Sequence, residues 1–235
     1  TATIAEADIP SLAYYATLSQ AMAFKLPAVA ARTHDILRLV LRSGDTRIST
    51  TEDAIDLFPS VAPTSAPSNV IIIAKGQPLA GLAPSGAIRA RIEAGATAMV
   101  FSPSKEIATL FPNDLVDVKG DASKPEYVEF ADWQPAAGTQ LTQNLEPMDL
   151  KWWARKGDDR AFIASSSHRL KPGSPARVLL RFVPPHGYIS ADKLPEQYRS
   201  VMSEIRLGKG RLWICDLDLD VCAGADPIAD IFTAN

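Results

Sequence analysis

The sequence predicts an α/β domain that follows a short antiparallel β segment and a proline-rich connection. Three observations lead to this prediction. Residues 36–42 alternate apolar and polar side chains, which is typical of a half-buried strand. Residues 60–68 carry prolines among small polar residues, the composition of an extended linker. From residue 69 onward, apolar runs alternate with segments of helical spacing, which indicates a layered α/β fold.

The composition is that of a folded globular chain. Of the 235 residues, 46% are hydrophobic and 22% are charged, and the net charge is −3 with 24 basic and 27 acidic residues intermixed. No basic run or basic amphipathic stretch is present, so we do not expect nucleic acid or a membrane surface as a partner. The apolar runs, such as residues 70–74, are much shorter than the roughly 18–20 residues that a membrane-spanning helix needs.

The first segment, residues 1–59, reads as antiparallel β structure. Alternation places the leucines of residues 36–42 on one face and Arg38 and Arg42 on the other. A hairpin turn is expected around Gly44, with the returning strand reaching Phe58. We also expect residues 14–26 to form another strand or two. Three or four strands leave a sandwich incomplete, with unpaired edges and an uncovered face.

The second segment, residues 69–235, begins with a β-branched run at residues 70–74, which predicts a strand buried on both faces of a parallel sheet. Helical spacing follows at residues 86–94, and residues 96–101 read as the next strand. A short helix is then expected at residues 102–110, with serine as its cap and proline at its first position. This order of strand, helix, strand and helix favours an α/β sheet.

The rest of the second segment is read less fully. Short strands are expected near residues 127–130 and 160–164, and a longer one at residues 177–183. Residues 201–219 predict a β-hairpin that turns at Gly208, Lys209 and Gly210. A final helix should begin at Asp226 and Pro227.

The sequence contains no recognisable catalytic or metal-binding motif. No serine or cysteine lies between the two glycines of a nucleophile elbow, and Cys215 sits inside a predicted strand as a core thiol. Cys215 and Cys222 are expected either to pair or to remain free. The three histidines, His34, His168 and His186, lack the spacing of metal ligands. We therefore predict no catalytic residue, no metal and no cofactor.

Three aspartates close the predicted hairpin. Asp216, Asp218 and Asp220 alternate with leucines, so a strand would direct all three to one side. A calcium loop is excluded, because Val221 replaces the required glycine and Pro227 stands at the position of the bidentate glutamate. Two interpretations remain: a solvated strand end, or a polar cluster at the carboxyl end of a strand, where α/β folds bind ligands.

Four aromatic or imidazole side chains are candidates for carbohydrate binding. Trp152 and Trp153 are adjacent, and His186 and Tyr188 lie in a segment rich in proline and glycine. Sugar rings present flat apolar faces that stack on exposed aromatic rings. Neighbouring residues of a strand point to opposite sides, so one tryptophan is expected in the core and the other at the surface. In the alternative interpretation both tryptophans are packed.

Several segments resemble the C-terminal region of glycoside hydrolase family 2, the β-galactosidase-type proteins. They are residues 70–74, 145–153, 207–212 and 226–232, which are similar to a flavodoxin-like, class I glutamine-amidotransferase-like domain. Such a domain also serves as the β-galactosidase trimerisation domain. Residues 54–59 look like the end of the immunoglobulin-like domain that precedes it. The resemblance implies a three-layer domain that supports oligomers or walls the active-site cleft of a neighbouring domain, and it assigns no catalytic residue to this chain.

Three hypotheses on function follow. The first is a non-catalytic C-terminal portion of a glycosidase that supports assembly or active-site cleft formation, since a catalytic eight-fold barrel does not fit in this chain. Its expected partners are the catalytic domain, carbohydrate or further copies of the chain. The second is a carbohydrate-binding module. The third is a stand-alone hydrolase or amidotransferase with an unusual site, in which Cys215 or His168 would be essential. A periplasmic or secreted location is favoured over a cytoplasmic one.

Overall fold

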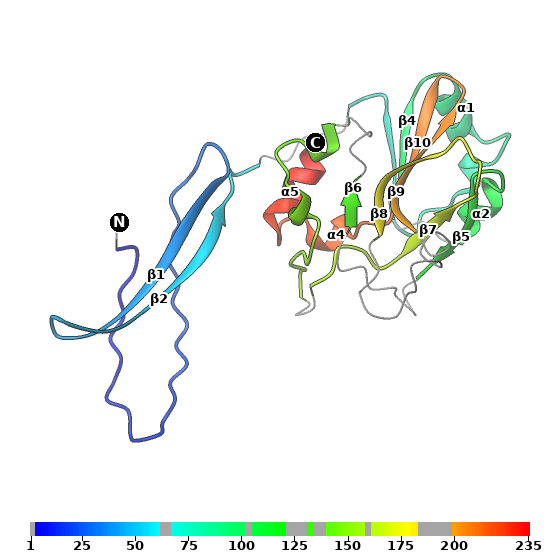
Figure 1. Ribbon diagram of the computed structural model, residues 1–235. Helices are drawn as coiled ribbons and strands as arrows, with labels where there is room; N and C mark the ends of the chain where they lie inside the picture. The colour runs from blue at the N-terminus through cyan, green and yellow to red at the C-terminus, as the bar shows by residue number, and fades with distance from the viewer. Residues whose placement is uncertain are drawn as a thin grey trace. The chain divides into compact units, whose positions relative to one another are not determined.

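A computed structural model describes residues 3–61, 67–101, 105–120, 131–133, 140–157, 161–182 and 199–235. The chain divides between Ser60 and Val61 into two compact units, which are treated separately below (Figure 1). This division falls within the predicted linker, whose residues 62–66 lie outside the described ranges. None of the helices in these ranges is long and apolar enough to cross a membrane.

The first unit contains one long β-hairpin. Strand β1 (Thr33–Ser43) pairs antiparallel with β2 (Thr46–Leu57), and Gly44 adopts a φ of 54° in the turn between them. These strands and this turn confirm the prediction for residues 36–58. Register pairs place Arg38 opposite Glu52, and the Arg38 Nε lies 2.6 Å from the Glu52 Oε1. The leucines at positions 37, 39 and 41 occupy the other face of β1.

The predicted strand at residues 14–26 is wrong. Residues 3–32 contain no helix or strand, and their one regular feature is a turn at Tyr14 and Tyr15. A β-strand is stable only when its backbone N–H and C=O groups form hydrogen bonds with a neighbouring strand. In the described part of the first unit, β1 and β2 bond only with each other, so no neighbour is provided.

The second unit is built on a mixed sheet, with strand order β3-β4-β10-β9-β7-β5 and with β8 paired to β9 and β6 paired to β8. Its strands are β3 (Val70–Ile73), β4 (Thr97–Phe101), β5 (Leu115–Lys119), β6 (Ala131–Trp133), β7 (Ser167–Leu170), β8 (Arg177–Phe182), β9 (Ser200–Leu207) and β10 (Gly210–Cys215). Strands β3, β4 and β10 are parallel, and the other pairings are antiparallel. The α/β class is therefore confirmed in its coarse form.

The helices in the described part of this unit are short. They are α1 (Ala87–Glu93), α2 (Glu106–Leu110), α4 (Leu219–Cys222) and α5 (Pro227–Ala234), with 3₁₀ turns η1 (Ala80–Leu82), η3 (Gln140–Thr142) and η4 (Pro147–Asp149). Asp226 caps α5, because its side chain accepts hydrogen bonds from the amides of Ile228 and Ala229. The predictions of β3, α1, β4, β8, β9 and α5 are confirmed within a few residues.

The main core lies on one face of the sheet. Ile92 from α1 and Ile107 from α2 pack there against side chains of β3, β4, β9 and β10. Along each strand the buried residues alternate with more exposed ones, as Ala98 and Val100 do with Thr97, Met99 and Phe101 in β4. Consequently β3 is not buried on both faces as predicted, since Ile72 is 45% exposed.

Several predicted elements differ from the structure. Strand β10 ends at Cys215. The backbone amide of Asp216 still bonds to Val201 of β9, but that of Asp218 bonds to Ile163, away from the β9 ladder. Residues 161–164 form no strand, although Ala164 makes a single bridge to Leu217. The predicted strand at residues 127–130 and the start of the helix at residues 102–104 lie outside the described ranges.

Candidate functional site

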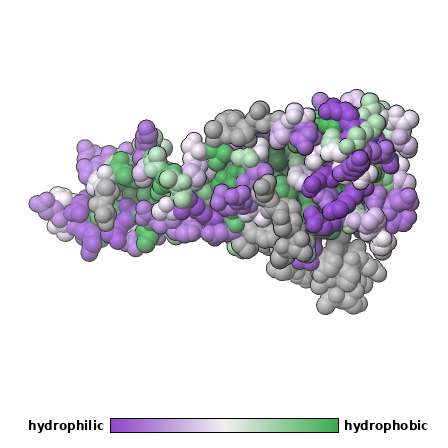
Figure 2. All heavy atoms as spheres, turned by 90° about the horizontal axis from the view of Figure 1, so that it is seen from above, coloured by the Kyte–Doolittle hydropathy of each residue, from purple (hydrophilic) through white to green (hydrophobic). Residues whose placement is uncertain are grey.

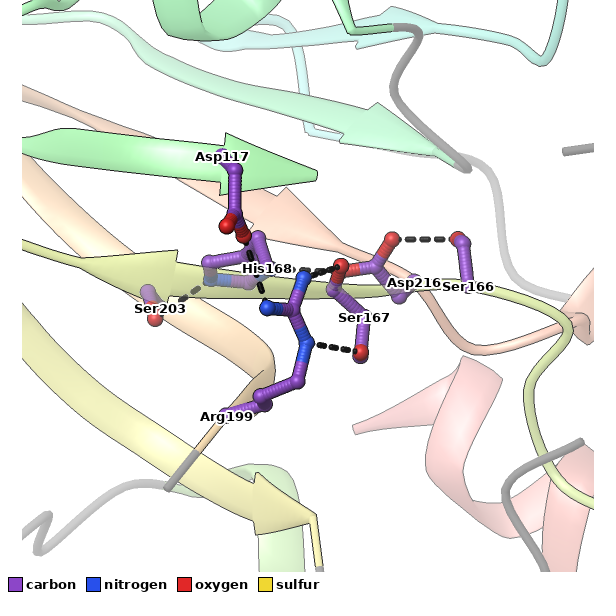
Figure 3. Close-up of polar contacts among 7 residues, drawn as sticks. All are labelled: Asp117, Ser166, Ser167, His168, Arg199, Ser203 and Asp216. Carbon is purple, nitrogen blue, oxygen red and sulfur yellow. Dashed lines mark hydrogen bonds and ion pairs between the residues drawn. The ribbon is translucent and has the colours of Figure 1, made fainter. Parts of the chain in front are cut away.

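A buried polar network lies where β7, β9 and β10 meet (Figure 3). His168 comes from β7, Ser203 from the middle of β9, and Asp216 follows the last residue of β10. All three have 0% of their surface exposed. Cross-strand pairing aligns Ser203 with Ile214, so Ser203 faces the same side of the sheet as the main core.

The three side chains form a linear chain of hydrogen bonds. The His168 Nε2 lies 2.7 Å from the Ser203 Oγ, and the His168 Nδ1 lies 2.5 Å from the Asp216 Oδ2. The hydroxyl of Ser166 donates to the other carboxylate oxygen of Asp216, which fixes the orientation of that group. Ser, His and Asp are thus connected in the order found in serine hydrolases, with the same two imidazole nitrogens in the same roles.

The surroundings of this network argue against a nucleophilic role for Ser203. A reactive serine must be reached by a substrate carbonyl, yet in the described arrangement the Ser203 hydroxyl is completely covered. Ser203 also lies inside strand β9, paired with β8 on one side and β10 on the other, whereas hydrolase nucleophiles sit on a strained turn. The network instead satisfies polar groups that burial would otherwise leave without hydrogen bonds.

A second polar cluster ties the start of β9 to β5 and β7. Arg199 is almost fully buried, and its Nε and Nη2 donate to the hydroxyl and the carbonyl of Ser167 at 2.6 and 2.8 Å. Its Nη1 reaches the Asp117 Oδ1 at 2.7 Å, and the other Asp117 oxygen accepts from Arg169 at 3.0 Å. These bonds join three strands through charged groups, and Figure 3 shows Arg199 beside the His168 network.

Asp218 forms a third buried contact at the carboxyl edge of the parallel strands. Its carboxylate accepts hydrogen bonds from the Arg155 Nη1 and the Ser165 hydroxyl, both at 2.8 Å. Burial raises the pKa of Asp218, and the bonds from Arg155 and Ser165 and the charge of Lys75 oppose that rise. The acidic groups at the edge where α/β folds bind ligands are therefore hydrogen-bonded to other residues of this chain.

The structure separates the three aspartates that the sequence grouped together. Asp216 and Asp218 are buried and paired, so a solvated strand end is the wrong interpretation for them. Asp220 lies on α4 and is exposed, because the strand has already ended at Cys215. Across the described ranges no group of three or more His, Cys, Asp and Glu side chains is placed to hold a metal ion.

The two tryptophans have opposite environments. Trp153 is 1% exposed, packs against Phe232 with ring centroids 6.1 Å apart, and donates from its Nε1 to the Asp149 carbonyl at 2.7 Å. Its proposed role in carbohydrate binding is wrong, because its ring is in the core. Trp152 is 54% exposed, and the Lys151 Nζ lies 3.8 Å from its ring centroid. His186 and Tyr188 lie outside the described residues.

Both cysteines are buried and free, so the disulfide alternative is wrong. Burial is the main cause of a raised pKa for both thiols, and the pKa of Cys222 reaches about 11. The thiol of Cys215 is therefore a core group, as predicted.

Sequence reasoning missed Ser166, Ser203 and Arg199. No local motif marks them, because each is brought to its partners by strand pairing between distant segments. Comparisons of the chain with protein-family models, with curated proteins and with solved structures found no match.

Proposed function

We propose that this chain is a non-catalytic assembly portion of a carbohydrate-active protein of the glycoside hydrolase family 2 type. The observation that carries the proposal is the exposed β-hairpin of the first unit. The glycosidase context comes from the resemblance of five sequence segments, and the assembly role comes from the structure of the hairpin.

A two-stranded hairpin is at best marginally stable in water by itself. Here Leu39 is 65% exposed, and Leu41 on the same face of β1 is 41% exposed. Hydrophobic residues reach the surface of this unit in Figure 2, where they are green at the left. An apolar surface of this kind is typical of an interaction site, so further β structure from the assembly should cover it.

The polar groups of the second unit support a non-catalytic role. Asp216, Asp218 and His168 would be the natural acids and base of an active site at this edge of the sheet. All three are buried and hydrogen-bonded to partners within the chain. Such groups stabilise one packing arrangement and are not presented to a substrate.

The flavodoxin-like assignment belongs to the same proposal. It is supported by the parallel pairs β3–β4 and β4–β10, with helix α1 connecting β3 to β4 as a crossover. The antiparallel strands β5, β7, β8 and β9 extend this core in the described residues. We interpret them as an elaboration of a smaller parallel α/β sheet.

The reading frame that encodes the chain gives the first test. We expect this frame, or one beside it, to encode an eight-stranded glycosidase barrel. Absence of any barrel-coding sequence there would contradict the proposal. When the chain is mixed with the purified barrel polypeptide, amide hydrogen exchange in β1 and β2 should become slower than in the chain alone. A Leu39→Asp variant should lose that protection, while Thr50→Asp, on the opposite face, serves as its matched control.

Carbohydrate binding at Trp152 is a second candidate, favoured by a side chain that is 54% exposed. Titration with soluble polysaccharides, followed by tryptophan fluorescence, tests it. A Trp152→Ala variant should lose binding and Trp152→Phe should largely retain it. No binding by the unmodified chain, or equal binding by Trp152→Ala, would remove this candidate.

A further inference from the structure

The second face of the sheet, opposite the main core, carries two rows of side chains in register. In the first row Ile72, Met99, Trp213, Glu204 and Arg177 are successive partners across β3, β4, β10, β9 and β8. Their neighbours along each strand point into the core, so these side chains point away from it.

The second row runs parallel to the first, one step of two residues along the strands. Its members are Val70, Thr97, Arg211 and Arg206, again as successive partners. The two rows together give a face that is apolar over β3 and β4 and basic over β8, β9 and β10. Trp213 lies at the boundary between these halves.

Among the described residues, the basic half has three arginines around one carboxylate, that of Glu204. Glu204 is 3% exposed, accepts from the Trp213 Nε1 at 3.1 Å, and lies 3.5 Å from a guanidinium nitrogen of Arg211. Arg177 and Arg206 approach the same carboxylate at 3.6 and 3.7 Å. Arg206 and Arg211 are also directly opposite each other, and like charges in this position repel.

This face is the one that parallel strands normally bury. Sheets with parallel strands usually have helices on both faces, and here α1 and α2 pack on the other one. On this face Cys215 and Met202, one step beyond Trp213 and Glu204, are fully buried, so the accessible part is formed by the two rows described above. Ile72 is exposed and Met99 and Trp213 are partly exposed. Tryptophan, methionine and arginine are enriched in protein interfaces, so the composition of the face fits a protein partner.

We propose that this face docks an amphipathic helix of a partner protein, with its apolar side over Ile72, Met99 and Trp213 and its carboxylates against Arg206 and Arg211. A helix about 10 Å wide covers about two strand spacings of roughly 4.8 Å, so its apolar stripe spans β3 to β10 and its acidic flank reaches β9. A second copy of the same face would bring arginines against arginines, and this disfavours self-docking. The inference concerns the second unit and does not depend on the proposed glycosidase context.

A displayed library of amphipathic helices tests the proposal with the full chain as bait. Each peptide has 14 residues, a leucine stripe, and flank positions randomised among Glu, Lys, Gln and Ser. We expect Glu to be enriched on one flank. In fluorescence anisotropy, the Arg206→Glu/Arg211→Glu variant should bind the selected peptide about tenfold more weakly, as loss of two interfacial charge contacts predicts. The same peptide with Lys in place of Glu on its flank should bind the Arg206→Glu/Arg211→Glu variant more tightly than the unmodified chain.

The matched control is Arg42→Glu/Arg91→Glu, which changes the net charge equally at exposed positions on β1 and α1. Its affinity should equal that of the unmodified chain. Enrichment of Lys or Gln, failure to select any helix, or equal loss in the control would overturn the proposal. So would sedimentation showing a dimer that Arg206→Glu/Arg211→Glu dissociates, or binding of oligogalacturonate that this variant abolishes.

Discussion

The His168 network offers a direct test of a structural against a catalytic role. Ser203→Ala removes the hydroxyl that lies 2.7 Å from the His168 Nε2 and leaves that nitrogen buried without its partner. The cost of one unsatisfied buried group is about 1–3 kcal/mol of unfolding free energy. Asp216→Ala removes a buried carboxylate that accepts from both His168 and Ser166, and breaking a buried pair costs about 3–5 kcal/mol.

Urea unfolding followed by tryptophan fluorescence measures these losses. Asp220→Ala is the matched control, because Asp220 is exposed on α4, and its change should stay within about 0.5 kcal/mol. The three variants should therefore be ranked Asp216→Ala, Ser203→Ala and Asp220→Ala in order of decreasing loss. Hydrolysis of p-nitrophenyl acetate is measured on the same samples.

One outcome would refute the structural reasoning. If Ser203→Ala kept the stability of the unmodified chain but abolished a measurable esterase activity, Ser203 would be a nucleophile that a substrate reaches. A structural network gives the opposite result, in which stability falls and any background ester hydrolysis is unchanged. Ser203→Ala is the variant that distinguishes the two roles, because its smaller expected loss of unfolding free energy leaves the chain folded.

Three further predictions concern other parts of the chain. Trp153→Ala should cost about 3–5 kcal/mol of unfolding free energy in urea titrations, because it empties a core site. Trp152→Ala should cost about 1 kcal/mol at most, from the lost contact with Lys151, and equal effects would contradict the assigned environments. The thiol of Cys222, with its pKa raised by burial to about 11, should react with a disulfide reagent at pH 8 only after urea is added. A hydrogen bond from Arg32 is the main cause of the lowered pKa of Asp56. The ionised Asp56 therefore stabilises the first unit above the unfolded pKa of 3.8, and this stabilisation is lost as pH falls through the lower folded pKa. NMR titration should show that Arg32→Gln raises the pKa of Asp56.

Elements with a local signal were predictable from the sequence. The alternation in residues 36–42 fixed β1, and Gly44 located its turn. Helix α5 follows from an aspartate cap before a proline, which is a purely local pattern. Strands β5 and β7 were missed, because each has only four or five residues and no clear alternation.

The site depended on information that no local pattern contains. His168, Ser203 and Asp216 are separated by 35 and 48 residues along the chain in the two contacts that join them. Their meeting requires the order β10-β9-β7, and strand order follows from packing of the whole sheet. The aspartates after β10 were read as a continued strand, because period two persists through residue 220, whereas the backbone amide of Asp218 bonds to Ile163 and no longer to β9.

The buried acids of this chain are paired within the fold, whereas its exposed surfaces carry groups that a partner could contact. At the carboxyl edge of the parallel strands, Asp216 already pairs with His168 and Asp218 with Arg155. Among the described residues, two exposed surfaces carry groups that could recognise a protein partner: the leucine face of β1 and the Arg206–Arg211 face of the sheet. The two surfaces differ in chemistry, since the first is apolar and the second is half basic. Salt should distinguish them, because screening weakens contacts to the arginines and leaves apolar contacts to Leu39 largely unchanged.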